Sequence, residues 1–396
     1  MKRRSSILAI ALGAALAGGC GPAPVATAPT NTGPAAALSP TALLSGDAGD
    51  GFARALAPRP FHFPEDHGPH PAFRSEWWYF TGVLHEVTAD GPSRRRFGYQ
   101  LTIFRQALGA HAEPRASAWA SRDIYMAHLA VGDLDGAGSG GGPRFHAAEA
   151  FARSGLGLGG ARAQPFAVWA NAWRISGPDR GADIFPAQLQ AADDAMAIDL
   201  SVDAGRGPIL QGDRGLSVKG RQPGNASYYY SCTRLPTRGT IRVGQRTFTV
   251  AGDSWLDREW STSALDPSLA GWDWFGVSLS DGRDLMVYRL RGRDGSMAPE
   301  SRATIIDADG TTRLFAPPSF TITAGARWTS ARSGAAYPAR LRLVIPADGT
   351  DVQIDPLLAD QELALSVRYW EGAAEVSGRV RGAPAVGSGF LELTGY

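Results

Sequence analysis

Short stretches that alternate between hydrophobic and polar residues run along most of the chain beyond residue 55. RFGYQLTIFR, AMAIDLSVD and ARLRLVI place apolar side chains at every second position, a pattern typical of β-strands. Turn-forming pairs such as Asp281-Gly282, Asp294-Gly295 and Asp309-Gly310 separate many of these stretches. Long segments of helical periodicity are absent, so the sequence predicts an all-β fold of antiparallel strands.

Two of these segments follow the same plan. The stretches Trp78–Arg105 and Trp274–Arg291 each contain an aromatic cluster, a glycine, a short apolar run, a turn and a strand that ends in arginine. Chance similarity between two amphipathic hairpins would give the same two matches. If the repeat is real, the chain consists of two related β modules in tandem, with a boundary near residues 235–243.

The N-terminal segment has the pattern of a secretion signal. Basic residues at 2–4 precede the apolar run 7–16, which ends in small residues before Cys20 and is too short to span a bilayer. A cysteine in this position resembles the lipobox of bacterial lipoproteins, although Ala17 stands where a large apolar residue is usual. We therefore expect residues 1–20 to be a lipoprotein signal peptide, Cys20 to carry lipid, and the protein to be anchored to a membrane of the bacterial cell envelope, facing the periplasm or the exterior.

The remaining chain divides by composition. Residues 21–55 are mostly Ala, Pro, Thr and Gly and are expected to form a disordered tether. The folded part is expected to comprise two domains, residues 56–237 and 238–396. The net charge of +1 and the scattered arginines give no basic patch, so the sequence does not predict nucleic-acid binding.

The sequence disfavours a cysteine nucleophile, a metal site and a serine hydrolase. Cys232 is the only cysteine besides Cys20, and a lone cysteine in a strand is usually a small buried hydrophobe rather than a nucleophile. His62, His67 and His70 crowd a Pro-rich segment without a matching pattern of carboxylates, so we predict no metal and no cofactor. The sequence contains no G-x-S-x-G elbow, which disfavours a serine hydrolase.

The segment DSWLDREW, residues 253–260, places acids between tryptophans. In a strand, Trp255, Asp257 and Glu259 would project from one face and Arg258 from the other. Two acids held close together in a low-dielectric setting cannot both ionise cheaply, so one should have a raised pKa and could donate a proton.

A third candidate acid, Asp273, lies in the following segment GWDWFG. It would share a strand face with Phe275, with Trp272 and Trp274 on the opposite face. The loop 261–270 is long enough to arch over the mouth of a pocket.

A purely structural interpretation competes with the catalytic one. Arg258, together with Arg105 or Arg291, could neutralise the three candidate acids in a buried ion network with the tryptophans as packing. Residue types alone favour this structural interpretation.

The sequence also resembles a known family. Its motifs include HPAFRSEWWYFTGVL, GNASYYYSCTRL, GDSWLDREWSTSAL, YWEG and the terminal GFLELTGY. From about residue 60 to Tyr396 they are similar to the carotenoid 1,2-hydratase (hydroxyneurosporene synthase) superfamily of tandem lipocalin-like proteins. Many members are named only as predicted secreted hydrolases, a label that no nucleophile in this sequence supports.

The resemblance implies two lipocalin-like β-barrels or sandwiches packed side by side, with a pocket for an apolar small molecule near their junction. In the hydratases, an acid adds water across an isoprenoid double bond without metal or redox chemistry. Asp257 or Asp273 would donate the proton and Glu259 would tune the donor or orient water. The expected binding residues are Glu76, Trp77, Trp78, Tyr79, Arg105, Tyr229, Trp255, Arg258, Trp272, Trp274, Tyr288 and Trp370.

Two functions remain open from the sequence. The protein could be a cofactor-free hydratase, or a related acid–base enzyme, that acts on an isoprenoid, carotenoid-like or other lipid. It could instead be a lipoprotein that binds or carries an apolar ligand, with a structural network of acids, arginines and tryptophans.

Overall fold

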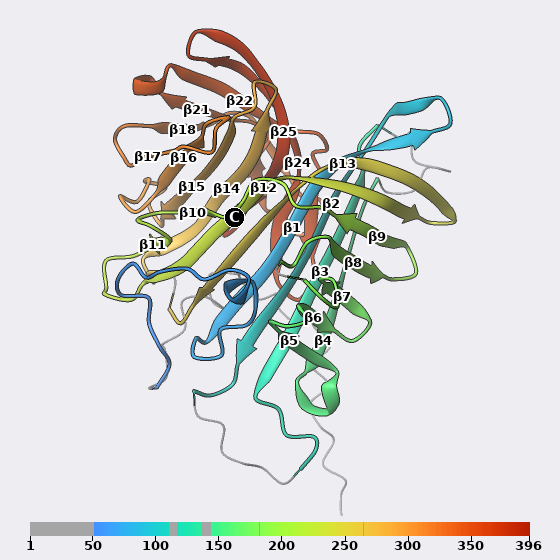
Figure 1. Cartoon of the computed structure of the whole chain (residues 1–396). Coiled ribbons are helices and arrows are strands. Elements are labelled where there is room, and N and C mark those ends of the chain that lie inside the picture. The colour runs from blue at the N-terminus through green and yellow to red at the C-terminus, as the bar shows by residue number, and fades with distance from the viewer. Residues whose placement is uncertain (1–50, 111–116, 136–143, 182, 264) are drawn as a thin grey trace, which may run out of the picture. The chain divides into compact units, whose positions relative to one another are not determined.

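The computed structural model describes residues 51–110, 117–135, 144–181, 183–263 and 265–396, and its regular structure is almost entirely β (Figure 1). The predicted signal peptide, Cys20 and most of the predicted tether lie outside the described residues. No helix in the described part of the chain is long and apolar enough to cross a membrane. The short 3-10 turns are η1 (Glu65–His67), η3 (Gly155–Gly157) and η4 (Pro346–Asp348).

The first sheet has 13 strands, and its edge strands β4 and β5 contact each other, so that it curls into a nearly closed barrel. The central order is β2-β1-β13-β12-β9, all antiparallel. Its strands are β1 (Ser75–Thr88), β2 (Gly91–Ala107), β3 (Asp123–Asp133), β4 (Phe145–Arg153), β5 (Gly159–Arg162), β6 (Ala167–Ala170), β7 (Trp173–Ser176), β8 (Ala187–Ala192), β9 (Met196–Val202), β10 (Ile209–Leu210), β11 (Leu216–Val218), β12 (Ala226–Val243) and β13 (Arg246–Ser261).

The second sheet has 10 strands, and a separate two-stranded sheet pairs β19 with β20. The middle of the second sheet runs in the order β15-β14-β25-β24-β22. Its strands are β14 (Leu269–Leu279), β15 (Asp284–Gly292), β16 (Arg302–Ile306), β17 (Thr312–Phe315), β18 (Thr321–Ala324), β21 (Leu341–Ile345), β22 (Thr350–Pro356), β23 (Glu362–Ala364), β24 (Arg368–Val380) and β25 (Ala383–Leu393), with β19 (Arg327–Thr329) and β20 (Ala336–Pro338) apart.

Sheet membership places the division of the chain later than the sequence predicts. The predicted boundary between residues 237 and 238 falls inside β12, and β13 still pairs with β1 and β12. Gly244, at φ 59°, supplies the left-handed residue that closes the β12–β13 hairpin. The second sheet begins only at β14, so DSWLDREW belongs to the first sheet and not to the start of the second module.

Both faces of the central strands are buried, which explains why their sequences are so rich in large side chains. In β1 and β13, Trp78 and Leu256 pack in the core that the first sheet encloses, whereas Tyr79 and Trp255 pack in a third apolar cluster with side chains of the second sheet. The alternation of side chains therefore divides each strand between the interior of a barrel and the junction of the two sheets.

The two similar segments found in the sequence form corresponding hairpins. Trp78–Arg105 covers most of the β1–β2 pair, and Trp274–Arg291 covers most of the β14–β15 pair. In both hairpins, arginines of the second strand bind an acid of the first strand. This shared arrangement supports the interpretation of the chain as a tandem repeat.

Candidate functional site

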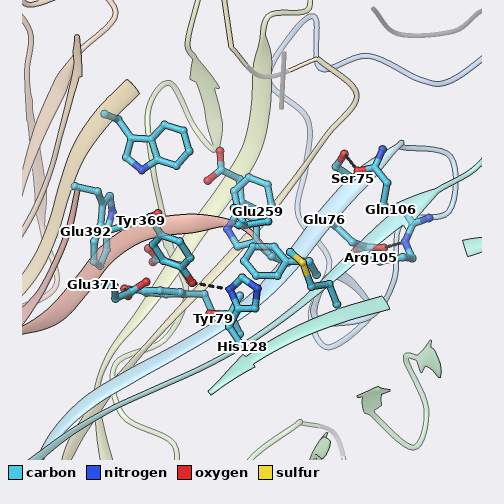
Figure 2. A pocket seen from close by; sticks show the side chains of 18 of the residues that line it. Ser75, Glu76, Tyr79, Arg105, Gln106, His128, Glu259, Tyr369, Glu371 and Glu392 are labelled. Carbon is cyan, nitrogen blue, oxygen red and sulfur yellow. Dashed lines mark hydrogen bonds and ion pairs between the residues drawn. The ribbon is translucent and has the colours of Figure 1, made fainter. Parts of the chain in front are cut away.

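A cavity of about 370 Å³ lies where the two sheets meet (Figure 2). Its walls are mainly apolar, with side chains from β1, β2, β3, β4, β12 and β13 on one side and from β14, β15, β24 and β25 on the other. The aromatic lining residues are Trp77, Tyr79, Phe104, Phe151, Tyr229, Trp272, Trp274, Tyr288 and Tyr369. The acidic lining residues are Glu76, Asp257, Glu259, Glu371 and Glu392.

On the first sheet, strand register brings the lining side chains into rows. Tyr79 lies opposite Asp257, and Trp77 lies opposite Glu259, across the β1–β13 pair. On the other side of β13, Tyr229 also lies opposite Glu259. Directly opposed residues in antiparallel strands share one face, so the predicted grouping of Asp257 and Glu259 on one face is confirmed.

A row across the second sheet supplies the opposite wall. Glu371 of β24 lies opposite Glu392 of β25, Glu392 lies opposite Trp274 of β14, and Trp274 lies opposite Tyr288 of β15. The Cβ atoms of such opposed residues are about 5 Å apart. Pairing of the last two strands therefore holds two carboxyl groups side by side at the cavity wall.

Asp257 is buried, and its carboxyl group accepts three hydrogen bonds. Tyr229 Oη donates to Oδ2 at 2.6 Å, while Ser231 Oγ and Trp255 Nε1 donate to Oδ1 at 2.6 and 2.7 Å. The pKa of Asp257 is raised to about 7: burial is the main cause, the three donors oppose the rise, and the Glu259 carboxylate adds a smaller rise. The predicted raised pKa is therefore present in this acid pair, with desolvation as its main cause.

Glu259, the partner of Asp257 on the same strand face, is bound by a cation. Lys219 forms an ion pair with its carboxylate, and Ser227 Oγ donates a hydrogen bond to the same oxygen. The Lys219 ammonium also lies 5.3 Å from the ring centroid of Tyr229 and 5.7 Å from that of Tyr288. One of the two lysines of the chain thus lies in the cavity wall and neutralises the acid next to Asp257.

Glu371 and Glu392 have fewer partners than Asp257. Tyr79 Oη donates a hydrogen bond to Glu371. Burial and the neighbouring Glu392 carboxylate raise the pKa of Glu371 well above its ordinary value. Burial also raises the pKa of Glu392 to about 7, although a hydrogen bond from Trp272 opposes the rise. At neutral pH the pair therefore retains at least one proton.

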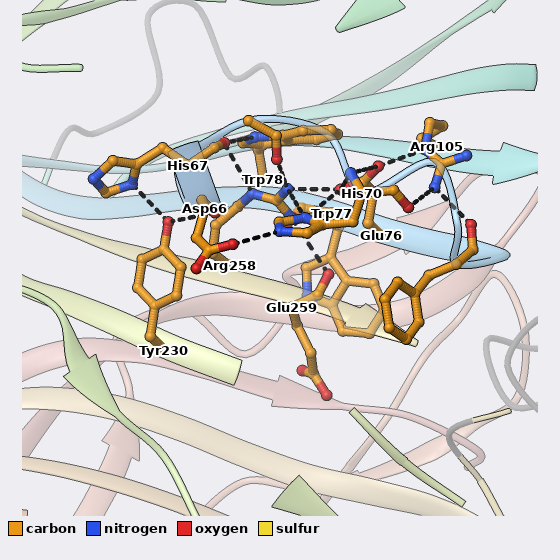
Figure 3. Close-up of polar contacts among 12 residues, drawn as sticks. Asp66, His67, His70, Glu76, Trp77, Trp78, Arg105, Tyr230, Arg258 and Glu259 are labelled. Atoms are coloured by element: carbon orange, nitrogen blue, oxygen red, sulfur yellow. Dashed lines mark hydrogen bonds and ion pairs between the residues drawn. The ribbon is translucent and has the colours of Figure 1, made fainter. Parts of the chain in front are cut away.

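A separate ion network lies beside the cavity at Glu76 (Figure 3). Its carboxylate accepts hydrogen bonds from the guanidinium groups of Arg105 and Arg258, the latter at 2.6 Å. Burial alone would raise the pKa of Glu76, but Arg258 and Arg105 hold it well below its ordinary range. The guanidinium of Arg258 also stacks on Trp78, 3.9 Å from the ring centroid. This network is structural, as expected for Arg258 and Arg105, but its carboxylate is Glu76 rather than Asp257 or Glu259.

Asp273 does not line the cavity, so its position does not support the predicted role as a proton donor there. Its carboxylate binds the guanidinium groups of Arg289 and Arg291 and accepts a hydrogen bond from Tyr396 Oη at 2.7 Å. Alternation along β14 directs Asp273 away from Trp272 and Trp274, which line the cavity. The sequence assigned the two faces correctly but could not tell which of them met the first sheet.

The other predicted binding residues divide between the cavity and its surroundings. Trp78, Arg258 and Trp370 do not line the cavity: the first two belong to the Glu76 network and Trp370 packs in the core of the second sheet. Trp255 reaches the site through its hydrogen bond to Asp257 while lining a smaller cavity of about 160 Å³. The predicted residues that do line the main cavity are Glu76, Trp77, Tyr79, Arg105, Tyr229, Asp257, Glu259, Trp272, Trp274 and Tyr288.

Several polar residues of the site were not predicted from the sequence, among them Lys219, Glu371 and Glu392. Glu371 follows Trp370 in YWEG, and Glu392 lies in the terminal FLELTGY, so both repeat the combination of an acid with apolar or aromatic neighbours. That signal marks a buried acid but does not reveal which strands meet. The loop after β13 does contribute a side chain to the cavity, Leu265, as its length suggested.

Cys232 lies in the core of the first sheet, whereas His128 lies at the cavity. Cys232 packs in the core of the first sheet, where burial raises the pKa of its thiol, as expected for a cysteine that is not a nucleophile. His128 lines the cavity, and its Nδ1 lies 2.8 Å from Tyr369 Oη. Burial lowers the pKa of His128 to about 3, so its ring is neutral at physiological pH.

Comparison with protein families assigns the chain to a family. A family model described as AttH-like matches residues 54–396. The chain belongs to the AttH-like family. An AttH-like protein from Nitrosomonas europaea, known from a crystal structure, is 34% identical in sequence to this AttH-like protein. The match covers 87% of this chain and 100% of the Nitrosomonas chain, and the two structures superpose with a TM-score of 0.74. This family fits the tandem lipocalin-like superfamily predicted from the motifs.

A more distant structure shares the fold of this AttH-like protein. Kievitone hydratase from Nectria haematococca is 18% identical, covers 87% of this chain and 95% of its own, and has a TM-score of 0.63. At this identity the likeness is one of fold alone. No protein of curated function matches the chain.

Proposed function

We propose that this AttH-like protein is a cofactor-free acid–base enzyme that adds water to, or removes it from, a carbon–carbon bond of an apolar substrate such as an isoprenoid, a carotenoid-like compound or another lipid. One observation carries the proposal. Asp257, Glu371 and Glu392 converge from two sheets on one apolar cavity, and none of the three forms an ion pair among the described residues.

The rest of the molecule shows why this lack of pairing is informative. Other buried acids are held by arginines: Glu76, at the edge of the same cavity, by Arg105 and Arg258, and Asp284 by Arg206 and Arg234. An arginine beside an acid would keep it ionised and unable to donate a proton. Asp257, Glu371 and Glu392 therefore differ from the arginine-bound acids of the same chain, because burial without an ion pair lets them keep a proton that acid catalysis can use.

In the proposed reaction, the Asp257 carboxyl transfers its proton to one carbon of a double bond, and the other carbon becomes a carbocation. Aromatic side chains of the cavity stabilise this cation through their π faces. A water molecule then forms the new carbon–oxygen bond and loses a proton to the Glu371–Glu392 pair. A pKa near 7 suits Asp257 to the first step, because the acid is still partly protonated near neutral pH and yet releases its proton readily.

The name of kievitone hydratase supports this reaction class, since it describes the addition of water by a protein with the same fold. The resemblance to the carotenoid 1,2-hydratase superfamily supports it in the same way. The substrate of this chain belongs to the proposal, and the apolar walls of the cavity favour a ligand that is mostly hydrocarbon.

The proposal is tested by first identifying the apolar compound that co-purifies with the protein by mass spectrometry. Turnover of that compound, or of its unsaturated relatives, is then followed in water labelled with oxygen-18. Asp257→Asn should lower turnover by about 100-fold or more while the ligand still binds. Glu375→Gln, which changes an exposed acid on β24, is the matched control and should leave turnover unchanged. A hydrated product without the label, or equal turnover by both variants, would refute the proposal.

A non-catalytic carrier of apolar ligands is the second candidate. Its supporting observation is that both oxygens of Asp257 already accept hydrogen bonds, an arrangement that also suits a structural carboxyl group. A carrier would bind the co-purified compound without converting it, and Asp257→Asn would then alter stability or affinity alone.

We also propose that the protein works at the bacterial cell envelope, attached by lipid at Cys20. Metabolic labelling with a clickable fatty acid should mark the wild-type protein. The Cys20→Ser variant should remain unlabelled.

A further inference from the structure

The cavity opens beside a group of exposed hydrophobic side chains. Of twelve large hydrophobic side chains exposed among the described residues, six lie on segments around the ends of β2, β3 and β4. We call them the mouth surface: Leu108, Trp119, Ile124, Phe151, Leu156 and Leu158. Trp119 is the most exposed of them, at 62% of its surface. Concentrations of this kind on a protein surface usually mark an interaction site.

Hydrogen bonds join the segments that carry the mouth surface. The Leu108 amide donates to the carbonyl oxygen of Arg122, and the Arg122 amide donates to Ser154 Oγ. Asn171 joins the next pair, because its Nδ2 donates to the carbonyl of Phe151 and its amide to that of Leu158. The segments that carry Leu108, Phe151 and Leu158 are therefore linked to their neighbours at this end of the first sheet.

The mouth surface is continuous with the cavity wall. Ile124 and Phe151 belong to both, since they are exposed and also line the cavity. Met126 lies opposite Phe151 in the β3–β4 pair and continues the apolar wall inward. Apolar side chains are thus continuous from the exposed surface at Ile124 and Phe151 to Met126 in the cavity wall.

Two further observations indicate what covers this surface. Arg122 and Arg153 are exposed beside it, and neither forms an ion pair among the described residues, so they can meet anionic headgroups. The start of the described chain lies next to it: the Ala53 amide bonds to the carbonyl of Ala72, and Arg122 Nη2 donates to that of Pro71 at 3.3 Å. In Figure 1 the blue start of the described chain and strands β4 and β5 lie toward the lower side of the view.

We propose that the mouth surface docks on a lipid bilayer that contains anionic lipids, and that apolar ligands move between the bilayer and the cavity past Ile124 and Phe151. The proposed lipid at Cys20 would supply one membrane signal and the mouth surface a second, which stable attachment generally requires. Tryptophan and leucine side chains insert at the level of the headgroups, while arginines contact the phosphates. This docking does not depend on whether the bound ligand is converted.

The first test uses tryptophan fluorescence of the full chain on vesicles of phosphatidylcholine and phosphatidylglycerol whose acyl chains carry bromine. Bromine quenches only tryptophans that reach the hydrocarbon. Trp119→Phe should lose a measurable part of the quenching, whereas Trp328→Phe, on β19 of the separate two-stranded sheet, should lose none. Equal quenching of wild type and Trp119→Phe would overturn the proposal.

The second test measures vesicle binding by sedimentation. A variant with Leu108, Phe151 and Leu156 changed to Ser should bind about tenfold more weakly or worse, and the Arg122→Gln, Arg153→Gln variant should lose its preference for anionic vesicles. The matched control changes Leu314 and Val386 to Ser, two exposed apolar residues of the second sheet. Every variant carries the same N-terminal segment, so a difference between variants reports on the changed surface alone.

Two outcomes of the binding measurements would also overturn the proposal. The first is an equal loss of vesicle binding by the mouth-surface variant and its control. The second is a wild-type dimer in light scattering that the mouth-surface variant abolishes with no change in vesicle binding, which would make a second copy of the chain the occupant. Both readouts are independent of turnover, so a failure of the proposed enzyme activity would leave them unaffected.

Discussion

Replacing Asp257 by Asn should stabilise the protein at neutral and alkaline pH. The folded state raises the pKa of this carboxyl from 3.8 to about 7, mainly through burial. At about 1.4 kcal/mol per pKa unit, ionised Asp257 costs the folded state about 4 kcal/mol. The amide of Asn has nearly the same shape, carries no charge, and can keep the hydrogen bonds from Ser231 and Trp255. Allowing for a weaker contact to Tyr229, we expect the free energy of unfolding of the variant to exceed that of the wild type by about 2–4 kcal/mol at about pH 8.

The sign of the effect with pH follows from proton binding. Between pH 3.8 and about 7, folded Asp257 holds a proton that the unfolded chain has released. The folded state therefore binds more protons, and the stability of the wild type falls as the pH rises through this window. Below this pH window Asp257 is protonated in both the folded and the unfolded state, and its contribution to the stability of the wild type is fully present. The advantage of Asp257→Asn should thus be near zero at about pH 4 and reach its full value only above about pH 7.

Urea denaturation of the wild type and the variant, at closely spaced pH values from about 4 to 8.5, measures this difference. Asp273→Asn is the matched control: it changes an acid held by Arg289 and Arg291 and should lower the free energy of unfolding by about 3–5 kcal/mol at neutral pH. A variant at Asp257 that is less stable than the wild type by the same margin at every pH would refute the assigned protonation. A more stable protein that has lost turnover would mark Asp257 as a residue retained for function.

Two further predictions concern the other acids. Burial and the Glu392 carboxylate raise the pKa of Glu371, so Glu392→Gln should lower the pH at which Glu371 loses its proton in a carboxyl NMR titration, and an unchanged curve would contradict the coupling. Glu76→Gln should lower the free energy of unfolding by about 3–5 kcal/mol at neutral pH, because it leaves Arg105 and Arg258 buried without a carboxylate. Since the pKa of Glu76 lies below its ordinary 4.5, this loss should shrink in urea denaturation as the pH falls below that value, and a loss that did not change with pH would speak against an ionised Glu76.

The periodicity of the sequence predicted local features well, because side chains in a strand alternate whatever the strand packs against. It placed Asp257 and Glu259 together on one face of a strand and Trp272 and Trp274 together on another. The all-β class followed from the same pattern. These features depend on neighbours within a few residues, which the sequence shows directly.

Strand partners and the roles of acids were harder to infer, because they depend on contacts between distant segments. Asp257 and Asp273 look alike in the sequence, each flanked by tryptophans. Only the packing of the sheets turns Asp257 to the cavity and Asp273 to the arginines Arg289 and Arg291. The predicted division at residue 237 falls inside β12 for a related reason, since hairpin pairing keeps β13 in the first sheet.

The sequence by itself determined the strands, the face on which each side chain lies and the presence of acids that have to be buried among aromatic residues. Only the tertiary structure decided which buried acids form ion pairs with arginines and which line the cavity without one. Glu371 and Glu392 enter the site because β24 and β25 pair with each other and β25 pairs with β14. The charge state of a buried carboxyl depends on what lies within a few ångströms in space, and in a sheet most of those neighbours come from strands that are remote in the chain.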